Sequence, residues 1–339
     1  MAFLLFGREI SEQTVLYSFF GLVIGIFLLV DLGFFNKSAH KITTKSALYQ
    51  SIFWVIISTI FGYVIYIYGP YEVEVSGQIK SISSLTATME YFTAYLTEYA
   101  LSVDNIFVIL LILKYFQVKD EFYHRILFWG IFGAVVFRGI FIFVGAYFIA
   151  KFHWLLYIAG VFLIYSGVKI YFEDSDEKID PEKNPVLRLC RKYLPISNED
   201  ANGQFTTKEN GKFMFTPLFL VIVLIETTDL LFAVDSIPAA FAITQSEFLI
   251  YTSNIFAVMG LRAMFFLLSG IIDKFYLLQK GLSIILFFIG AKMLLEIVDF
   301  ELPPVLSFSV IIAILTLSIV FSVLVPRKDQ PEESEDVSG

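Results

Sequence analysis

The sequence is poor in the residues that form disulfides, imidazole-rich metal sites and charged surfaces. Cys190 is the only cysteine, which excludes an intrachain disulfide and a cysteine metal cluster. The chain has three histidines, and charged residues make up 17% of it. No basic patch accompanies the net charge of −8, so we expect no nucleic-acid partner.

Apolar side chains dominate instead. They make up 57% of the 339 residues, with 38 phenylalanines, and the mean hydropathy is +0.75. A transmembrane helix needs about 20 such residues to cross about 30 Å of hydrocarbon, and its backbone must satisfy its own hydrogen bonds there. We therefore predict an all-α polytopic membrane protein with nine transmembrane helices. The expected spans are 14–33, 46–68, 88–113, 125–149, 153–172, 214–242, 248–272, 280–298 and 304–325.

Lysines and arginines predict how these spans are oriented. With nine spans, seventeen of these residues fall in the connections on one side and three in those on the other. Because cytoplasmic loops carry the excess, we expect the N-terminus outside and the C-terminus in the cytoplasm. The predicted organisation is a transmembrane transporter domain over 1–325, with a cytoplasmic loop at 173–213 and a disordered acidic cytoplasmic tail at 326–339. A short helix is expected near Val186–Tyr193 in that loop.

Two parts of the sequence resemble each other. The order acid, Asp, Arg, Gly-x-Lys occurs twice, and the matching segments are 98–106 with 229–237, 131–138 with 255–262, and 167–169 with 290–292. Each copy holds three helices, 88–172 and 214–298, and an odd number makes the second copy cross in the opposite direction. We therefore predict inverted repeats, the architecture of secondary transporters, with a substrate site at the repeat interface near the midplane.

Ionisable residues lie inside the predicted spans, where a carboxylate costs at least roughly 2.5–3.5 kcal/mol on insertion scales. The five acids are Glu98, Asp104, Glu226, Asp229 and Asp235. One interpretation is purely structural: the acids only pair with Arg138 and Arg262, which are also mid-span. Five acids exceed two arginines, so a cation or protons should balance the surplus. Lys169 and Lys292 lie near helix ends, and we interpret them as structural residues that reach the interface.

Neighbouring residues supply further oxygen atoms. On a regular helix Asn105 shares a face with Glu98, and Ser236 shares one with Asp229, whereas the second acid of each motif points elsewhere. Pro238 would allow a break in its helix that brings carboxylate and backbone oxygens together.

Such hard oxygen donors suit Mn²⁺, Mg²⁺ or Ca²⁺, and ligand type alone does not separate the three. His40, His124 and His153 lie at span ends or in loops, so we expect no imidazole-rich core site for copper or zinc. The candidate metal ligands are Glu98, Asp104, Asn105, Glu226, Asp229, Asp235 and Ser236, with Arg138 and Arg262 as charge-pairing residues. Asn254 and Thr227 are further oxygen donors. Surplus carboxylates can also carry protons, which would allow exchange of metal for protons.

The acidic segments resemble the signature helices of a known family. EYALSVDNIFV at 98–108 and ETTDLLFAVDSIPA at 226–239 are similar to those of the TerC family, in particular its Alx-type members. Asp31-Leu32, Ala39-His40 and TSNIFAVMGLRAM at 252–264 also resemble that family.

This resemblance covers about residues 14–325. It implies an inner-membrane protein that exports Mn²⁺ (manganese) from the cytoplasm and belongs to a wider superfamily of inverted three-helix repeats. It also implies that the five acids are the metal ligands. Mn²⁺ is then the transported substrate, no organic cofactor is expected, and the partners are the ion and the lipid bilayer. Protons are a candidate counter-ion, because surplus carboxylates can carry them. Glu226 has Tyr95 as its counterpart in the first copy, so we expect an asymmetric site.

Two other classes of function stay open. Some relatives in photosynthetic membranes suggest a membrane-biogenesis or assembly factor that acts through protein partners, and such a factor would tolerate neutralised acids. An intramembrane aspartyl protease would share one proton between paired carboxyls. The sequence has no Gly-x-Gly-Asp motif and no Ser/His pair at membrane depth, so we expect no enzyme. Oligomeric state, coupling ion and transport direction are not written in the sequence.

Overall fold

Each of the nine predicted spans overlaps an α-helix in the computed structural model. The structure describes residues 3–5, 8–10, 12–34, 43–69, 71–75, 78–152, 154–172, 184–197, 203–209, 211–269, 276–298, 300 and 302–324. The α-helices of these residues are α1 (Glu12–Phe34), α2 (Thr44–Tyr68), α3 (Ser84–Tyr115), α4 (Asp120–Lys151), α5 (Leu155–Phe172), α6 (Pro185–Tyr193), α7 (Pro217–Ile243), α8 (Glu247–Leu268), α9 (Tyr276–Leu295) and α10 (Pro304–Leu324). A 3-10 helix, η3 (Glu296–Val298), follows α9.

The predicted all-α polytopic membrane fold is confirmed. Eight of the described helices are long and apolar enough to cross a membrane, namely α2 to α5 and α7 to α10. The apolar stretch of α1 is shorter, at Leu16–Leu28, so the count of nine spans stays a prediction. The short helix expected in the loop is α6. The predicted disordered tail at 326–339 lies outside the described residues.

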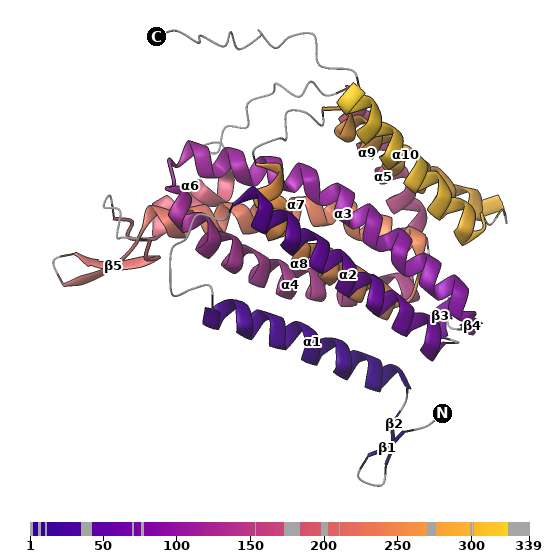
Figure 1. The fold of residues 1–339 in the computed structure, drawn as a ribbon. Coiled ribbons are helices and arrows are strands. Elements are labelled where there is room, and N and C mark those ends of the chain that lie inside the picture. The colour runs from indigo at the N-terminus through magenta and orange to yellow at the C-terminus, as the bar shows by residue number, and fades with distance from the viewer. Residues whose placement is uncertain are drawn as a thin grey trace.

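The structure contains three small antiparallel hairpins that the sequence analysis did not predict. They are β1 (Phe3–Leu5) with β2 (Arg8–Ile10), β3 (Tyr71–Val75) with β4 (Gln78–Ile82), and β5 (Thr206–Glu209) with β6 (Lys212–Phe215). Figure 1 shows β5 projecting from one end of the bundle, and β3 and β4 at the other end. The hairpins therefore lie at the ends of the membrane helices and leave the buried centre entirely helical.

The helices of the two predicted repeats are interleaved. α3 and α4 of the first copy both pack against α7 and α8 of the second, and α5 makes its most extensive contact with α9. Around this centre α2 covers α3 and α8, whereas α10 covers α3 and α9 (Figure 1). The four helices α3, α4, α7 and α8 thus form the core in which the buried acids lie.

Hydroxyl caps fix where two of these core helices begin. The Ser83 hydroxyl accepts a hydrogen bond from the backbone N–H of Thr86 at the start of α3, at 3.1 Å. The Ser246 hydroxyl accepts one from the N–H of Leu249 at the start of α8, at 3.4 Å. Such caps satisfy backbone donors that have no partner inside the helix.

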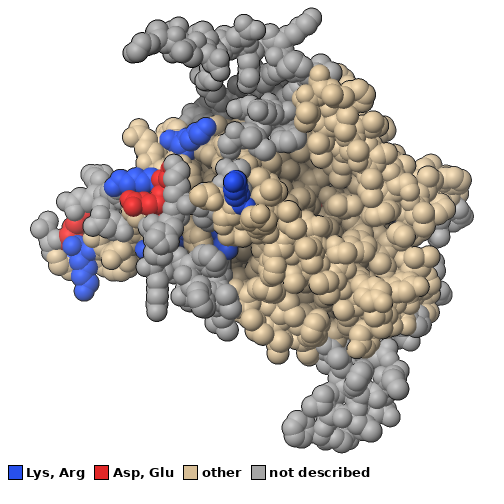
Figure 2. Space-filling view, in the orientation of Figure 1, with Lys and Arg blue, Asp and Glu red and all other residues tan. Residues whose placement is uncertain are grey.

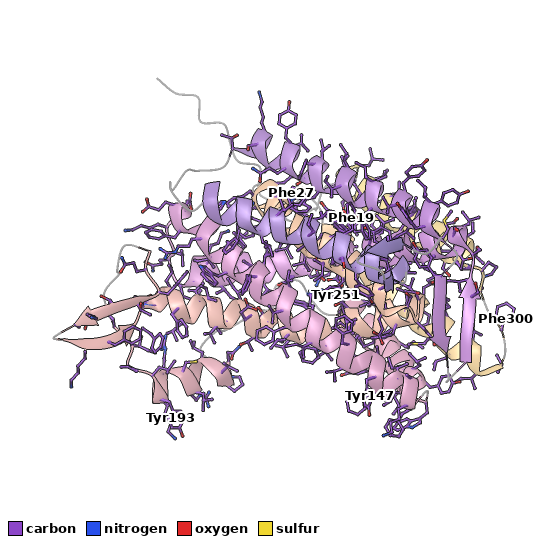
Figure 3. All side chains as sticks on the ribbon, turned by 90° about the horizontal axis from the view of Figure 1, so that it is seen from below. Phe19, Phe27, Tyr147, Tyr193, Tyr251 and Phe300 are labelled. Atoms are coloured by element: carbon purple, nitrogen blue, oxygen red, sulfur yellow. The ribbon has the colours of Figure 1, made fainter. Side chains whose placement is uncertain are left out.

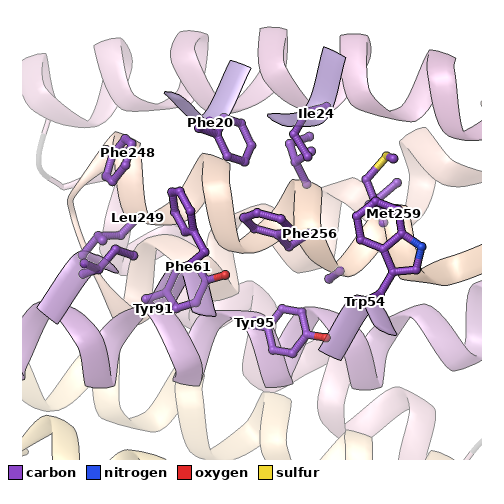
Figure 4. Packing of buried hydrophobic residues seen from close by; sticks show 14 of the residues in the cluster. Phe20, Ile24, Trp54, Phe61, Tyr91, Tyr95, Phe248, Leu249, Phe256 and Met259 are labelled. Atoms are coloured by element: carbon purple, nitrogen blue, oxygen red, sulfur yellow. The ribbon is translucent and has the colours of Figure 1, made fainter. Parts of the chain in front are cut away.

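Aromatic packing holds α1 and α2 onto the bundle. The Phe20 ring of α1 lies 5.6 Å from the Phe61 ring of α2 and 5.5 Å from the Phe256 ring of α8, measured between centroids. Figure 4 shows these rings together with Trp54 and Tyr91 in one buried cluster. Because apolar burial is non-directional and scales with area, interlocked rings of this size make a strong contact.

The outer surface matches a membrane environment. In Figure 2 the described residues over a broad face are uncharged, and the described Lys, Arg, Asp and Glu gather toward one end of the molecule, where α6 and β5 lie. Large apolar residues point outward along the helices, as Phe19 and Tyr147 do in Figure 3. A water-soluble protein rarely exposes so continuous an apolar surface.

Candidate functional site

A buried arginine joins the core helices. Arg138 of α4 is 1% exposed. Its Nε and Nη2 donate to Asp229 Oδ2 at 3.2 Å and Asp229 Oδ1 at 2.9 Å, which is a bidentate pair. Its Nη1 forms an ion pair with Glu98 Oε1 and also donates to Asn254 Oδ1 at 2.9 Å. We call these four residues the arginine clamp; it ties α4 to α3, α7 and α8.

Two amide side chains, Asn254 of the clamp and Asn105 beside it, also donate hydrogen bonds to the clamp carboxylates. Asn254 Nδ2 donates to Glu98 Oε2 at 2.9 Å, and Asn105 Nδ2 donates to Asp229 Oδ1 at 2.8 Å. Every carboxylate oxygen of Glu98 and Asp229 therefore accepts at least one hydrogen bond. Glu98 and Asp229 are 3% and 5% exposed, so these bonds replace the water that two buried anions would otherwise need.

Asp104 and Asp235 lie at a cavity beside the clamp. This acidic cavity has a volume of about 30 Å³, enough for roughly one water-sized occupant. α3 and α7 bring the two aspartates to it, one from each predicted repeat. Ser166 Oγ of α5 donates to Asp235 Oδ1 at 2.8 Å. The polar and charged residues that line it are Glu98, Ser102, Asp104, Asn105, Arg138, Asp235 and Ser236.

Three buried oxygen atoms of this cavity have no hydrogen-bond partner among the described residues. They are Ser102 Oγ, Asn105 Oδ1 and Ser236 Oγ, on residues that are 2%, 2% and 3% exposed. Because the Asn105 amide nitrogen donates to Asp229, its oxygen necessarily points elsewhere. Unpartnered buried oxygens are rare and call for an occupant such as a water or a cation.

Ser102 was missed by the sequence reading. It lies four residues after Glu98 and three before Asn105, so all three share one face of α3. This spacing could have identified Ser102, because Glu98 and Asn105 on the same face are both predicted ligands.

Glu226 lies apart from the acidic cavity. It does not line that cavity, and its carboxylate occupies the space that a side chain on Gly133 of α4 would fill. A second, mainly apolar cavity of about 20 Å³ lies between these helices, lined at its polar end by Asn105 and Asp229. Asn105 therefore borders both cavities. Glu226 Oε2 is buried and has no hydrogen-bond partner among the described residues.

The predicted ligands do not form a closed cage. Among the described residues, no group of three or more His, Cys, Asp or Glu is placed so that it could hold a metal ion. The clamp draws Glu98 and Asp229 toward Arg138, whereas Asp104 and Asp235 face the cavity. The five acids thus fall into three groups: the clamp pair, the cavity pair beside it, which Glu98 also borders, and Glu226.

Two further predictions concern α7: a helix break at Pro238 and an oxygen ligand from Thr227. The break expected at Pro238 is absent, because α7 runs uninterrupted from Pro217 to Ile243. The Thr227 hydroxyl donates to the Val223 carbonyl of its own helix at 2.6 Å and is not directed at the site.

The lysines and the second arginine take separate roles. Lys292 is buried, with 9% exposed, and donates to the Ala242 carbonyl near the end of α7, at 3.1 Å. Lys169 is exposed. Arg262 is partly buried on α8, and its charge-pairing role stays a prediction.

These features define a class: a multi-pass helical membrane protein with a small acidic cavity between its core helices. The chain belongs to the TerC family of integral membrane proteins, whose family model matches residues 83–330. An uncharacterized membrane protein of Myxococcus xanthus, STKORF319, is 42% identical over 302 residues, covering 88% of this chain and 89% of that protein.

Two bacterial relatives carry a functional name. Proteins of Salmonella typhi and Escherichia coli strain K12, both provisionally named as the membrane-bound redox modulator Alx, are 41% and 40% identical over 310 residues. Each comparison covers 91% of this chain and 94% of the relative. No solved structure matches the chain.

Proposed function

We propose that this protein is a secondary transporter that exports a divalent cation, Mn²⁺ above all, from the cytoplasm. The observation that carries the proposal is the acidic cavity. Asp104 and Asp235 face it from the two predicted repeats, together with the unpartnered oxygens of Ser102, Asn105 and Ser236. Carboxylate, amide and hydroxyl oxygens are the ligands that Mn²⁺, Mg²⁺ and Ca²⁺ prefer.

The arrangement supports binding that is followed by release. A permanent metal site surrounds its ion with a full set of ligands, whereas transport needs a site that fills and empties. Here the carboxylates of Asp104 and Asp235 and three neutral oxygens line the cavity, while Glu98, which also borders it, and Asp229 are engaged by Arg138. A rearrangement between the two repeats would complete the coordination of the ion and then break it. No enzymatic chemistry is part of this proposal.

The membrane setting belongs to the same proposal. The inner membrane is the location we propose, as the family resemblance implies, and the excess of Lys and Arg in one set of loops supports an outside N-terminus and a cytoplasmic C-terminus. Protons are the proposed counter-ion, because unliganded carboxylates in a membrane core carry protons readily.

Proteoliposomes with purified protein test the proposal. Mn²⁺ flux is measured across a pH gradient, with a pH dye inside and with Ca²⁺ and Mg²⁺ as competitors. Asp235→Asn serves as the inactive variant. We expect the wild type to move Mn²⁺ with a counterflow of protons and the variant to move none. Equal flux in the variant would remove Asp235 from the site.

A different class of function predicts a different outcome. If neither protein moves any divalent ion under either pH gradient, an assembly factor acting through protein partners becomes the better account. Thiol chemistry by an intrachain cysteine pair is excluded for this chain, because Cys190 stands alone. The redox name of the relatives therefore does not transfer through such a pair.

A further inference from the structure

The acceptors around Arg138 are those of a divalent-cation site. The guanidinium contacts Glu98 Oε1, both carboxylate oxygens of Asp229 and the amide oxygen of Asn254. All are hard oxygen atoms, as in Mg²⁺, Mn²⁺ and Ca²⁺ sites. A divalent ion placed between these groups would find its ligands without any new side chain.

The two buried carboxylates need a cation or protons to balance their charge. Glu98 and Asp229 are almost fully buried, and removing the cation of a buried pair leaves an uncompensated charge at high cost. Arg138 is tethered to α4 by its own side chain, so it can hold the two carboxylates whenever no ion does.

The acidic cavity adjoins the clamp directly. Glu98 and Arg138 line it, and Asn105, whose free oxygen faces away from Asp229, borders it as well. An ion held by Asp104 and Asp235 would therefore lie next to Glu98, and next to Asn105, which donates to Asp229.

We propose that Arg138 is an internal competitor of the transported cation. In the ion-free protein its guanidinium holds Glu98 and Asp229 together across the two halves; the incoming ion engages these carboxylates and displaces it. This inference rests on the proposed function. It adds that Arg138 holds the two carboxylates together while no ion is bound. The displaced clamp releases the tie of Arg138 on α4 to Asp229 on α7, which gives the two repeats freedom to move when an ion is bound.

Equilibrium binding of Mn²⁺ to the full chain in detergent tests the competitor. Loss of the free Mn²⁺ signal in electron paramagnetic resonance gives the Kd. Arg138→Lys keeps the charge but cannot bond both carboxylates in a fork. We expect it to bind Mn²⁺ about tenfold more tightly than the wild type, because a competing state has been weakened. Arg188→Lys, an exposed arginine of α6, is the matched control and should leave the Kd unchanged.

A second variant, Arg138→Gln, tests the same proposal if Arg138→Lys does not fold. Arg138→Gln leaves Glu98 and Asp229 without their cation, so its melting temperature should fall in the absence of metal. Added Mn²⁺ should restore it by more than Mn²⁺ raises that of the wild type. An unchanged Kd in Arg138→Lys together with no extra rescue of Arg138→Gln would overturn the proposal and make Arg138 a fixed structural pair.

The two proposals fail separately. If the wild type moves no Mn²⁺ in proteoliposomes while Arg138→Lys still binds it more tightly, the competitor stands and transport does not. If the wild type transports Mn²⁺ but the Arg138 variants bind and melt like the wild type, only the competitor is lost.

Discussion

Gly160 of α5 and Gly290 of α9 touch through their backbones. A side-chain carbon on Gly290 would lie 2.6 Å from the Gly160 carbonyl oxygen, and one on Gly160 would lie 3.2 Å from that of Gly290. Seven residues after Gly160, Gly167 makes the corresponding contact with Ser283, which lies seven residues before Gly290. Gly167 and Gly290 are matching positions of the two repeats, and Gly160 and Ser283 each lie seven residues before them. Exchanging α5 for α9 therefore converts one contact into the other. This is the relationship that two repeats with a common axis would produce, so the crossing supports the predicted inverted repeat.

The crossing predicts graded effects of adding one methyl group. Gly290→Ala should destabilise the protein by about 1–3 kcal/mol, because its new carbon meets backbone atoms that cannot move aside alone. Gly160→Ala should cost less, since its contacts start at 3.2 Å. Gly25→Ala on α1, where nothing lies within 4 Å, is the control. Thermal unfolding in detergent measures all three, and equal melting temperatures would contradict the close approach.

The acids of the clamp and those of the cavity should respond differently to neutralisation. Asp229→Asn removes the bidentate partner of a 1%-exposed arginine and should lower stability by about 3–5 kcal/mol. Asp104→Asn changes a half-buried residue at the cavity and should cost less than Asp229→Asn, because Asp229 is the bidentate partner of the buried arginine. Melting temperatures decide this; a larger loss in Asp104→Asn than in Asp229→Asn would reverse our assignment.

Transport should show the complementary pattern. Asp104→Asn and Asp235→Asn should abolish Mn²⁺ transport while the protein stays inserted and folded, because each removes a ligand charge from the cavity. Ser166→Ala removes only the hydrogen bond to Asp235, worth about 0.5–1.5 kcal/mol, and should raise the KM while transport continues. Wild-type flux in either aspartate variant would contradict the site.

Ser102→Ala separates the structure-based site from the sequence-based one. The Ser102 hydroxyl makes no hydrogen bond within the described residues, so its loss should leave the melting temperature nearly unchanged. If the hydroxyl binds the ion, the KM for Mn²⁺ should rise. An unchanged KM would leave Ser102 as lining without a role in binding.

Gly133→Ala tests the separate place of Glu226. The new methyl group would collide with the Glu226 carboxylate, the far end of a flexible side chain, so folding should change little. The carboxylate must move, and transport should change as it does in Glu226→Gln if that position matters. Gly25→Ala again controls for adding a methyl group to a membrane helix.

The sequence could predict which residues are buried but not how they are grouped. Hydropathy placed the helices because each needs a long apolar run, and the mid-helix acids were conspicuous for their cost. Their partners depend on how four helices pack, which no single-helix pattern contains. A continuous α7 replaced the break expected at Pro238, and packing of α3 against α7 brings Asp104 and Asp235 to one cavity. The hairpins were missed because their strands are only three to five residues long.

The arginine clamp also has a consequence for biosynthesis. α3 and α4 precede α7 along the chain, so Glu98 and Arg138 are synthesised before Asp229 and can pair before it arrives. α7 follows with the carboxylate of Asp229, which finds its counter-charge only if Arg138 is already in place. The clamp therefore joins charges that are synthesised at different times, and Arg138 is in the chain before its bidentate partner Asp229.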